Sequence, residues 1–418
     1  MVRQSKYVII VGDGMADYPL EALGGKTPLM AAKTPNLDWM AKQGEVGIVK
    51  TIPDGFSPGS EIANLSIFGY DPNRYYTGRG PLEAASMGIT LGLDDLAFRC
   101  NLVSLQERGT GLVMEDFSAG HITDKEATQI IADLNKELGT DEIQFYPGVS
   151  YRHLMVWKEG AARFPGLEIL ALTPPHDITD KAVSPYLPQA DGLHGNAEDK
   201  VLALMTESQR ILKSHPANLA REAKGLRPAN SIWLWGQGRS PRMVTLKERF
   251  GIEGYVISAV NLLKGIGILA GLEVLEVPGA TGYFDTNYDG KAQYALKGLK
   301  EKDFVYVHVE APDEAGHMGD LRLKIEAIEA FDEKIMGAIL KGMKEFECYR
   351  ILALPDHPTP IFLKTHAADP VPYVIYSNGD GLKGHGEAFD EVSAGKSAIF
   401  IEKGFELIER FLTPRCSG

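Results

Sequence analysis

The stretch YVIIVGD, residues 7–13, is a run of apolar, mostly β-branched residues that stops at an acid. Two later stretches have the same form, FVYVHVEAPD at 304–313 and ILALPDH at 351–357. Short apolar runs of this kind are typical of parallel strands that are buried on both faces. In open α/β sheets ligands bind at the carboxyl ends of the strands, so we expect the acids that end these three runs to converge on one crevice.

Apolar runs alternate with helical patterns along the 418 residues, which predicts an α/β fold with a mainly parallel sheet flanked by helices. The three similar strands come from both ends of the chain, so we expect a discontinuous core with an insertion. The pattern from 99 to 157 reads strand, strand, helix, strand, and SIWLWGQG at 231–238 is interpreted as a return to the core sheet. We therefore assign 1–105 and 185–418 to the core, and 106–184 to a smaller inserted α+β domain.

The composition is that of an ordinary soluble protein, with 44% hydrophobic and 24% charged residues. A net charge of −13 without a basic tract argues against a nucleic acid or an anionic membrane as partner. The three cysteines, Cys100, Cys348 and Cys416, are odd in number and far apart, which argues against a disulfide framework and for a reducing compartment. No apolar stretch reaches the length of a membrane span, and we expect a cytoplasmic protein.

Ser60 lies in GFSPGSEIANLSIFGYDP, residues 55–72, at the predicted start of a short apolar helix. In one interpretation Ser60 is an N-cap, because serine accepts a backbone N–H at helix starts. In the other it is a nucleophile, because the positive end of a helix also favours a transferred phosphoryl group. The stretch by itself leaves both interpretations open.

Carboxylates and histidines recur at spacings that suit metal binding. Asp313 and His317 are four residues apart, so both side chains point to one side of a helical turn and can chelate a divalent ion. Asp356 and His357 are adjacent at a strand end, and His366 follows shortly after. The alternatives are an exposed helix start for the first pair and a Pro-Asp turn with an incidental histidine for the second.

Together with Asp13 and Ser60 these residues supply seven donors, enough for two metal ions. Asp13 has its own alternative, since an Asp-Gly pair after a strand is most often a tight turn. Two adjacent ions suit in-line phosphoryl displacement, and they would add the positive charge that this acidic chain lacks. Oxygen and imidazole donors without thiolate favour manganese or magnesium, with zinc as an alternative.

Motifs along nearly the whole chain resemble one known family. They include DGMADYPLEALGGKTP, PGSEIANLSIFGYDP, YYTGRGPLEA, PPHDITD, VPGATGYFDTNYDGKA, EAPDEAGH and PDHPTP, in order between about residue 7 and about residue 378. This set resembles the archaeal-type 2,3-bisphosphoglycerate-independent phosphoglycerate mutases, a branch of the alkaline phosphatase superfamily. The resemblance implies an alkaline-phosphatase-like core and an inserted domain that grips the glycerate and closes over the site.

The resemblance also implies a reaction and its residues. Ser60 would become phosphorylated while 3-phosphoglycerate and 2-phosphoglycerate interconvert, without 2,3-bisphosphoglycerate. Two divalent ions are implied, manganese or magnesium first and zinc or cobalt as alternatives. One ion would be held by Asp13, Ser60, Asp356 and His357, and the other by Asp313, His317 and His366. The alternative function is a metal-dependent phosphatase or phosphotransferase acting on another phosphorylated metabolite, because one metal core serves several reactions.

Candidate substrate contacts come from the same resemblance. Arg79 in GRGP, and Arg152 with His153 in YRH, would bind the phosphate and carboxylate, since guanidinium fits both groups in a bidentate manner. His176 and Asp177 in PPHD would contact the hydroxyl groups. The alternative for each is a structural ion pair or a core histidine. The implied partner is a small molecule, and the sequence is compatible with a monomer and with a homo-oligomer.

Overall fold

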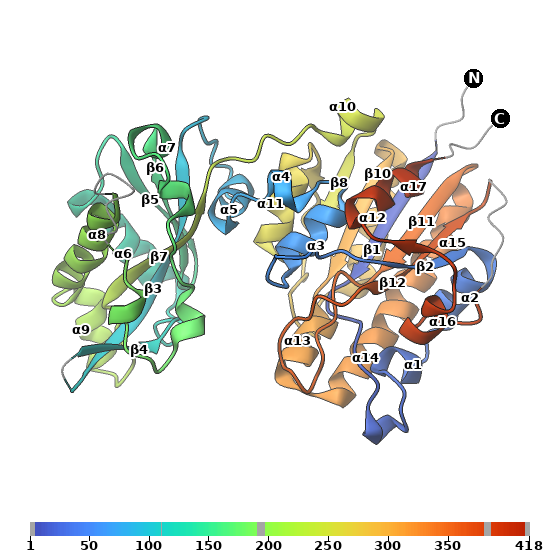
Figure 1. Cartoon of the computed structure of the whole chain (residues 1–418), viewed down its shortest axis with the longest axis horizontal. Helices are drawn as coiled ribbons and strands as arrows, with labels where there is room; N and C mark the ends of the chain where they lie inside the picture. Colours follow the sequence, from blue (N-terminus) through green and yellow to red (C-terminus); the bar gives the residue numbers. More distant parts are fainter. Residues whose placement is uncertain (1–4, 110, 190–196, 380–385, 414–418) are drawn as a thin grey trace. The chain divides into compact units, whose positions relative to one another are not determined.

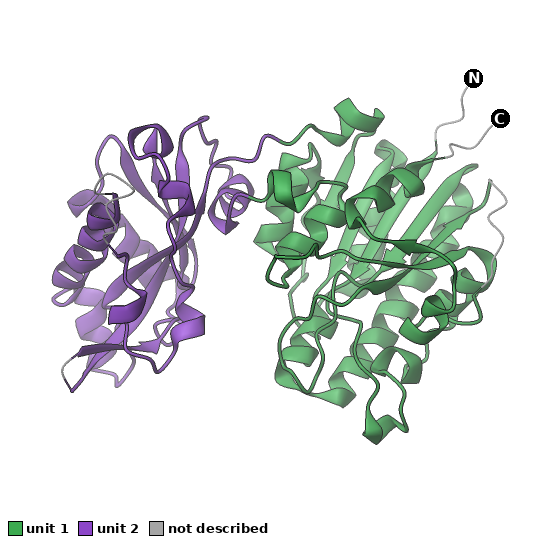
Figure 2. Cartoon of the chain, in the orientation of Figure 1, with its two compact units in different colours: residues 1–76, 243–418 green, residues 77–242 purple. Residues whose placement is uncertain are grey.

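The computed structural model describes the chain except for residues 1–4, 110, 190–196, 380–385 and 414–418. The described chain divides into two compact units, shown in different colours in Figure 2. Unit 1 combines residues 1–76 with 243–418, and unit 2 comprises 77–242.

Unit 1 is built on an eight-stranded sheet with strand order β13-β2-β12-β11-β1-β10-β8-β9. The central strand β1 pairs in parallel with β10 on one side and β11 on the other (Figure 1), and antiparallel pairing is confined to β12 with its two neighbours. The predicted α/β class with a mainly parallel sheet is confirmed. The strands are β1 (Lys6–Gly12), β2 (Glu45–Val49), β8 (Gly254–Ile257), β9 (Glu273–Val274), β10 (Phe304–Val309), β11 (Tyr349–Leu354), β12 (Val371–Ser377) and β13 (Phe400–Ile401).

Helices flank this sheet, and three of them, α1, α2 and α4, begin with a proline at the first helical position, where no backbone N–H is needed. Among the described residues no helix is long and apolar enough to cross a membrane. The helices of unit 1 are α1 (Pro28–Ala31), α2 (Pro35–Gln43), α3 (Ser60–Ile67), α4 (Pro72–Tyr75), α10 (Leu246–Phe250), α11 (Asn261–Leu269), α12 (Tyr288–Glu301), α13 (Ala311–Met318), α14 (Leu321–Ala330), α15 (Gly337–Gly342), α16 (Glu391–Gly395) and α17 (Leu407–Leu412), and a π-helical segment, Phe331–Met336, joins α14 to α15.

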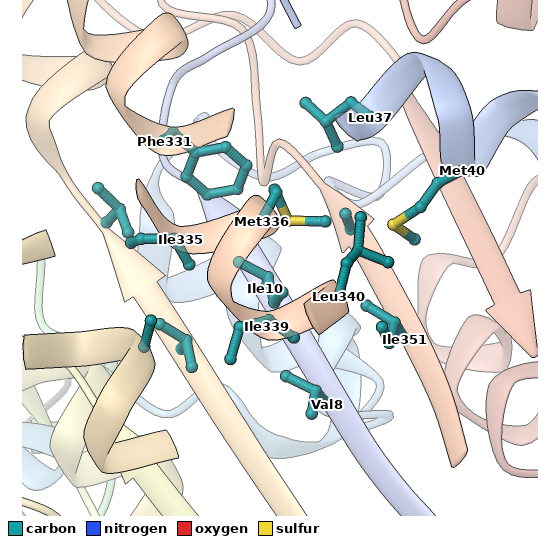
Figure 3. Packing of buried hydrophobic residues seen from close by; sticks show 14 of the residues in the cluster. Val8, Ile10, Leu37, Met40, Phe331, Ile335, Met336, Ile339, Leu340 and Ile351 are labelled. Atoms are coloured by element: carbon teal, nitrogen blue, oxygen red, sulfur yellow. The ribbon is translucent and has the colours of Figure 1, made fainter. Parts of the chain in front are cut away.

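The main core of unit 1 lies between the central strands and the helices that cover them (Figure 3). Val8 and Ile10 on β1 and Ile351 on β11 are fully buried beside side chains of the π-helical segment and α15. Burying each aliphatic side chain of this size contributes roughly 1.5–3 kcal/mol. The strands carry little polar alternation because helices pack on both faces of the sheet. This packing fixes the positions of the loops that follow the strands.

Unit 2 has an antiparallel five-stranded sheet around the long strand β3. One side of β3 pairs with β7 and the other with β6 and β4, and β6 continues to β5. Cys100 on β3 is a buried free cysteine and Cys416 lies outside the described residues, whereas Cys348 of unit 1 is disulfide-bonded, which differs from the expectation that the cysteines stay unpaired. The strands are β3 (Leu96–Arg108), β4 (Gly111–Asp116), β5 (Ile143–Val149), β6 (Arg152–Trp157) and β7 (Ser231–Gly238), and the helices are α5 (Arg79–Ser86), α6 (Asp124–Glu137), α7 (Gly160–Arg163), α8 (Ala197–Leu212) and α9 (Pro216–Glu222).

The bounds of unit 2 differ from those expected for the insertion. The sequence placed the boundaries at 106–184, whereas the compact unit spans 77–242. The interpretation of 231–238 as a strand of the core sheet is wrong, because β7 pairs with β3 from Val103↔Ser231 to Ala97↔Gly238. The physical reason is that β3 is one continuous strand across the expected boundary at residue 105. Because β6 and β7 both pair with β3, they belong to the same sheet. The segments around both expected boundaries therefore belong to unit 2.

Candidate active site

A first group of potential ligands lies where β1 and β11 end. Asp13 follows β1, and Asp356 and His357 follow β11, which pairs with β1 in parallel. The three side chains are at most 2% exposed. His357 Nε2 lies 3.4 Å from Asp13 Oδ1 and 3.6 Å from Asp356 Oδ2, and one donor atom from each residue falls within 4.8 Å of the others.

A second group comes from α13, which starts just after β10, and from the loop beyond β11. His317 Nε2 lies 3.2 Å from Asp313 Oδ2, and His366 Nε2 lies 3.5 Å from Asp313 Oδ1. The two imidazole Nε2 atoms are 2.9 Å apart. Asp313 is buried, so it is not the exposed capping residue that was one alternative. The structure therefore brings together the two pairs of residues singled out by their spacing, each with one further residue.

Ser60 is the first residue of α3, and its hydroxyl faces the first group. The N-cap position is occupied by Gly59, and no side chain caps this helix. The N-cap interpretation of Ser60 is therefore wrong. Ser60 Oγ lies 3.1 Å from His357 Nε2 and 3.5 Å from Asp13 Oδ2. The hydroxyl thus stands at the positive end of the helix dipole and beside an aspartate and a histidine of the first group.

The two groups differ in how their charge is balanced. Burial, together with the nearby carboxylates of Asp356, Asp313 and Glu310, raises the pKa of Asp13 well above its ordinary value. In the second group burial works against ionisation of Asp313, but hydrogen bonds from His317 and His366 hold its pKa well below the ordinary range. The same contact with Asp313 raises the pKa of His317 to about 9. The first group therefore lacks the positive charge that would keep Asp13 ionised, and a bound cation would supply that charge.

The structure adds polar residues around these groups that the sequence did not single out. His308 on β10 is fully buried, with Nε2 3.0 Å from Asp13 Oδ2. Asn64, one turn after Ser60, donates from Nδ2 to Asp356 Oδ2 at 2.8 Å and to the Ser60 carbonyl at 2.8 Å. A lone histidine in an apolar strand was the one signal for His308, and such residues are often satisfied core histidines.

A half-buried carboxyl, Glu391, predicts a pH effect on stability. Glu391 accepts hydrogen bonds from the Thr27 hydroxyl and the Asp17 amide at 2.7 and 3.0 Å, and burial raises its pKa from 4.5 to about 7. The folded state holds the Glu391 proton more tightly than the unfolded state does. The stabilisation that this carboxyl contributes is therefore fully present below about pH 4.5 and is lost as pH rises through 7. Ionisation of Glu391 is expected to lower the unfolding free energy by on the order of 3 kcal/mol as pH rises, and Glu391→Gln should abolish this decrease. Unfolding free energies of both proteins between pH 5 and 8 test this, and a difference that stays constant with pH contradicts it.

The candidate substrate residues all belong to unit 2, and two of them, Arg79 and His176, lie beside Trp235 on β7. The Arg79 guanidinium lies 5.6 Å from the Trp235 ring centroid, and the His176 ring lies 5.4 Å from it. Arg152 lies 5.2 Å from the neighbouring Tyr151 ring. Asp177 lies next to His176 in a short 3-10 helix, with Oδ1 3.7 Å from His176 Nε2. Cationic and aromatic side chains thus share one region of unit 2.

Two buried residues complete this region. Arg99, which the sequence did not single out, pairs with Glu83 at 2.9 Å and lies 4.7 Å from the Trp235 ring. Its pKa is lowered by burial, and the charges of Arg79 and Arg152 act in the same direction. His153 accepts from the Gly148 amide at 3.0 Å, and burial lowers its pKa to about 4, so its ring is neutral at pH 7.

Comparison with known proteins decides the family. The model of the 2,3-bisphosphoglycerate-independent phosphoglycerate mutases matches residues 41–218. The enzyme of this name from Methanosarcina barkeri is 52% identical, with 96% of this chain and 98% of that protein covered. This chain belongs to that family. A protein named as its probable member in Geobacter sulfurreducens is 51% identical over 97% of this chain and 99% of its own length.

Two solved structures share this architecture over nearly the whole chain. The cofactor-independent phosphoglycerate mutase of Thermoplasma acidophilum is 28% identical and superposes with a TM-score of 0.65, covering 98% of this chain and 99% of its own. A protein of Pyrococcus horikoshii reaches a TM-score of 0.82 at 29% identity, covering 100% and 99% of the two chains. Since the relatives extend over nearly the full length of this phosphoglycerate mutase family member, both units belong to the shared architecture.

Proposed function

We propose that this chain interconverts 3-phosphoglycerate and 2-phosphoglycerate, and that Ser60 carries the phosphoryl group between the two positions. The observation that supports this proposal most strongly is the position of the Ser60 hydroxyl at the start of α3. Its oxygen lies 3.1 Å from His357 Nε2 and 3.5 Å from Asp13 Oδ2. Membership of the phosphoglycerate mutase family gives the substrate class. We also propose that the reaction does not require 2,3-bisphosphoglycerate. The enzyme is proposed to be cytoplasmic and to act on a small molecule, without a nucleic acid partner.

The donor sets fit two divalent ions. Asp13 Oδ1 is buried and accepts no hydrogen bond from the described residues. In the other group, the imidazole nitrogens of His317 and His366 and a carboxylate oxygen of Asp313 lie within 4.8 Å of one another, so one ion could bind all three. Manganese or magnesium suits these oxygen and nitrogen donors best, and zinc or cobalt are the alternatives. We assign Asp13, Ser60, Asp356 and His357 to one ion, and Asp313, His317 and His366 to the other.

The reaction consists of two balanced transfers at Ser60. Ser60 Oγ forms a bond to phosphorus while the bond from phosphorus to O3 of the glycerate breaks, and the proton of the serine passes to O3. In the second transfer O2 of the glycerate forms a bond to phosphorus while the bond from phosphorus to Ser60 Oγ breaks, and the proton of the O2 hydroxyl passes to Ser60 Oγ as 2-phosphoglycerate forms. Bound divalent ions would lower the pKa of the serine hydroxyl and neutralise the phosphoryl oxygens. The helix dipole of α3 adds positive potential at the same position.

Unit 2 supplies the groups that we propose for substrate binding. Arg79 and Arg152 offer guanidinium groups for the carboxylate and phosphate oxygens. His176 and Asp177 are partly exposed and suit the hydroxyl groups. His153 is buried and neutral, so its contribution is a neutral ring nitrogen rather than a charge.

Phosphorus NMR tests the proposed activity. We expect the purified, manganese-loaded protein to convert 3-phosphoglycerate into 2-phosphoglycerate without added bisphosphoglycerate, and we expect a chelator to stop the conversion. Spectra are recorded after the enzyme is removed, so that the paramagnetic ion does not broaden the signals. Inorganic phosphate as the main product would show a phosphatase instead, and no conversion would show that another metabolite is the substrate.

Metal stoichiometry tests the assignment of the two groups. We expect the chelator-treated protein to bind two manganese ions, and Asp313→Ala and Asp13→Ala to bind one each, because each variant removes a carboxylate from a different group. Equilibrium dialysis with elemental analysis gives the number bound. Glu314→Ala, next to Asp313 but outside both groups, is the matched control and should still bind two. If both carboxylate variants keep two ions, the assignment is wrong.

A further inference from the structure

Thr359 lies between the two ligand groups and contacts both. Its hydroxyl donates a hydrogen bond to Asp313 Oδ1, in the second group. The same oxygen lies 3.2 Å from His357 Nδ1, in the first group. The side chain is fully buried. A single hydroxyl thus connects a carboxylate of one group to an imidazole of the other.

The position of this hydroxyl is fixed by the surrounding chain. The Thr359 amide donates to the Ala16 carbonyl at 3.2 Å, and the Thr359 carbonyl accepts from Lys324 Nζ at 2.8 Å. Gly14 and Gly316 pack against the residue so closely that a Cβ on either would lie 2.5 Å from its oxygen atoms. The absence of both side chains leaves room for the threonine. Its rotation is therefore restricted by contacts on both sides.

The number of protons available decides the direction of the second hydrogen bond. A threonine hydroxyl has one proton, and here it is donated to Asp313. The contact with His357 Nδ1 therefore requires Nδ1 to carry the proton and Thr359 Oγ1 to accept it. A neutral imidazole protonated on Nδ1 has its lone pair on Nε2. Nε2 is the atom that faces Ser60 Oγ at 3.1 Å and Asp13 Oδ1 at 3.4 Å.

We propose that Thr359 is a positioning residue that holds His357 in the tautomer with a free Nε2 and aligns it with Asp313. This inference rests on the proposed function, since it concerns the residues assigned there to the two ions. A histidine held by such a partner binds a metal without first changing its tautomer. Because one hydroxyl contacts both groups, its loss should weaken the binding of both ions rather than one.

The ring nitrogens of His357 provide a test that is independent of activity. Long-range proton–nitrogen correlation spectra of the metal-free full-length protein, with labelled histidine, distinguish the two tautomers, and His357→Gln assigns the signals. We expect Nδ1 to be protonated in the wild type and in Thr359→Ser, which keeps the hydroxyl. In Thr359→Val, which keeps the shape but lacks the hydroxyl, we expect a mixture of tautomers or the opposite one. Protonation of Nε2 in the wild type, or an unchanged spectrum in Thr359→Val, overturns the proposal.

Manganese titration provides the second readout. We expect Thr359→Val to weaken the binding of both ions by about 10-fold or more, and Thr359→Ser to bind nearly as the wild type does. Weakening in both variants would point to lost packing and would overturn the proposal. If Thr359→Val fails to fold, the His357 tautomer in the wild type and in Thr359→Ser still tests the proposal. Failure of the mutase assay would leave these results unchanged, so the two proposals are tested separately.

Discussion

Replacing Ser60 with alanine is expected to lower kcat for phosphoglycerate interconversion by at least about 10³-fold, because no other hydroxyl is assigned to carry the phosphoryl group. The substitution removes one oxygen from a half-buried position, so the fold should remain intact. Both ligand groups keep all their histidines and carboxylates, and manganese binding should therefore persist. Turnover is measured by the conversion of 3-phosphoglycerate into 2-phosphoglycerate.

Ser66→Ala is the matched control for this experiment. Ser66 lies in the same helix and is fully buried, and its hydroxyl has no hydrogen-bond partner among the described residues. Its removal should change kcat little. Full activity of Ser60→Ala would exclude a covalent phosphoserine. Equal losses in both variants would show that the helix, rather than the Ser60 hydroxyl, is what matters.

The largest expected effect on stability comes from Lys324. Its ammonium is completely buried and contacts Asp17 Oδ2 at 2.7 Å, as well as the Ala16 and Thr359 carbonyls. Lys324→Met leaves the Asp17 carboxylate buried without its partner charge, which typically costs about 3–5 kcal/mol. Urea unfolding of the metal-free protein measures the loss. Adding Asp17→Asn should restore part of it, because the double variant no longer buries an unpaired charge.

Arg322→Met serves as the matched control for Lys324→Met. Arg322 lies two residues earlier in α14 and pairs with Glu326 at 2.7 Å, but their side chains are 86% and 50% exposed. Exposed pairs of this kind contribute about 0–1 kcal/mol. Similar losses in the two variants, or no recovery in the double variant with Asp17→Asn, would contradict the importance of the buried pair.

The part of the site that could be predicted depends on local rules. Parallel strands present their carboxyl ends at one edge, so the acids after β1 and β11 could be placed together from sequence. The four-residue spacing likewise placed Asp313 and His317 on one side of α13. These features need no knowledge of distant packing. They account for most of the residues now found in the two ligand groups.

Other features depend on contacts between distant segments. The strand at 231–238 has the same apolar character as a core strand, and pairing with β3 alone decides that it belongs to unit 2. Thr359 and Lys324 look ordinary in sequence, because their importance comes from buried partners elsewhere in the chain. His308 could not be recognised from the sequence for the same reason, because its partner Asp13 lies far away in the chain. Buried polar residues of this kind are identified by what they contact, which periodicity does not reveal.

The central claim, that the phosphoryl group passes through Ser60, is tested most directly by trapping it. Stoichiometric manganese-loaded enzyme is mixed with 3-phosphoglycerate labelled in its phosphate, quenched in acid after milliseconds, and digested so that the labelled peptide can be sequenced. The account predicts label on the peptide containing Ser60, and no trapped label in Ser60→Ala. Label on another residue, or turnover in Ser60→Ala at the wild-type rate, would contradict it.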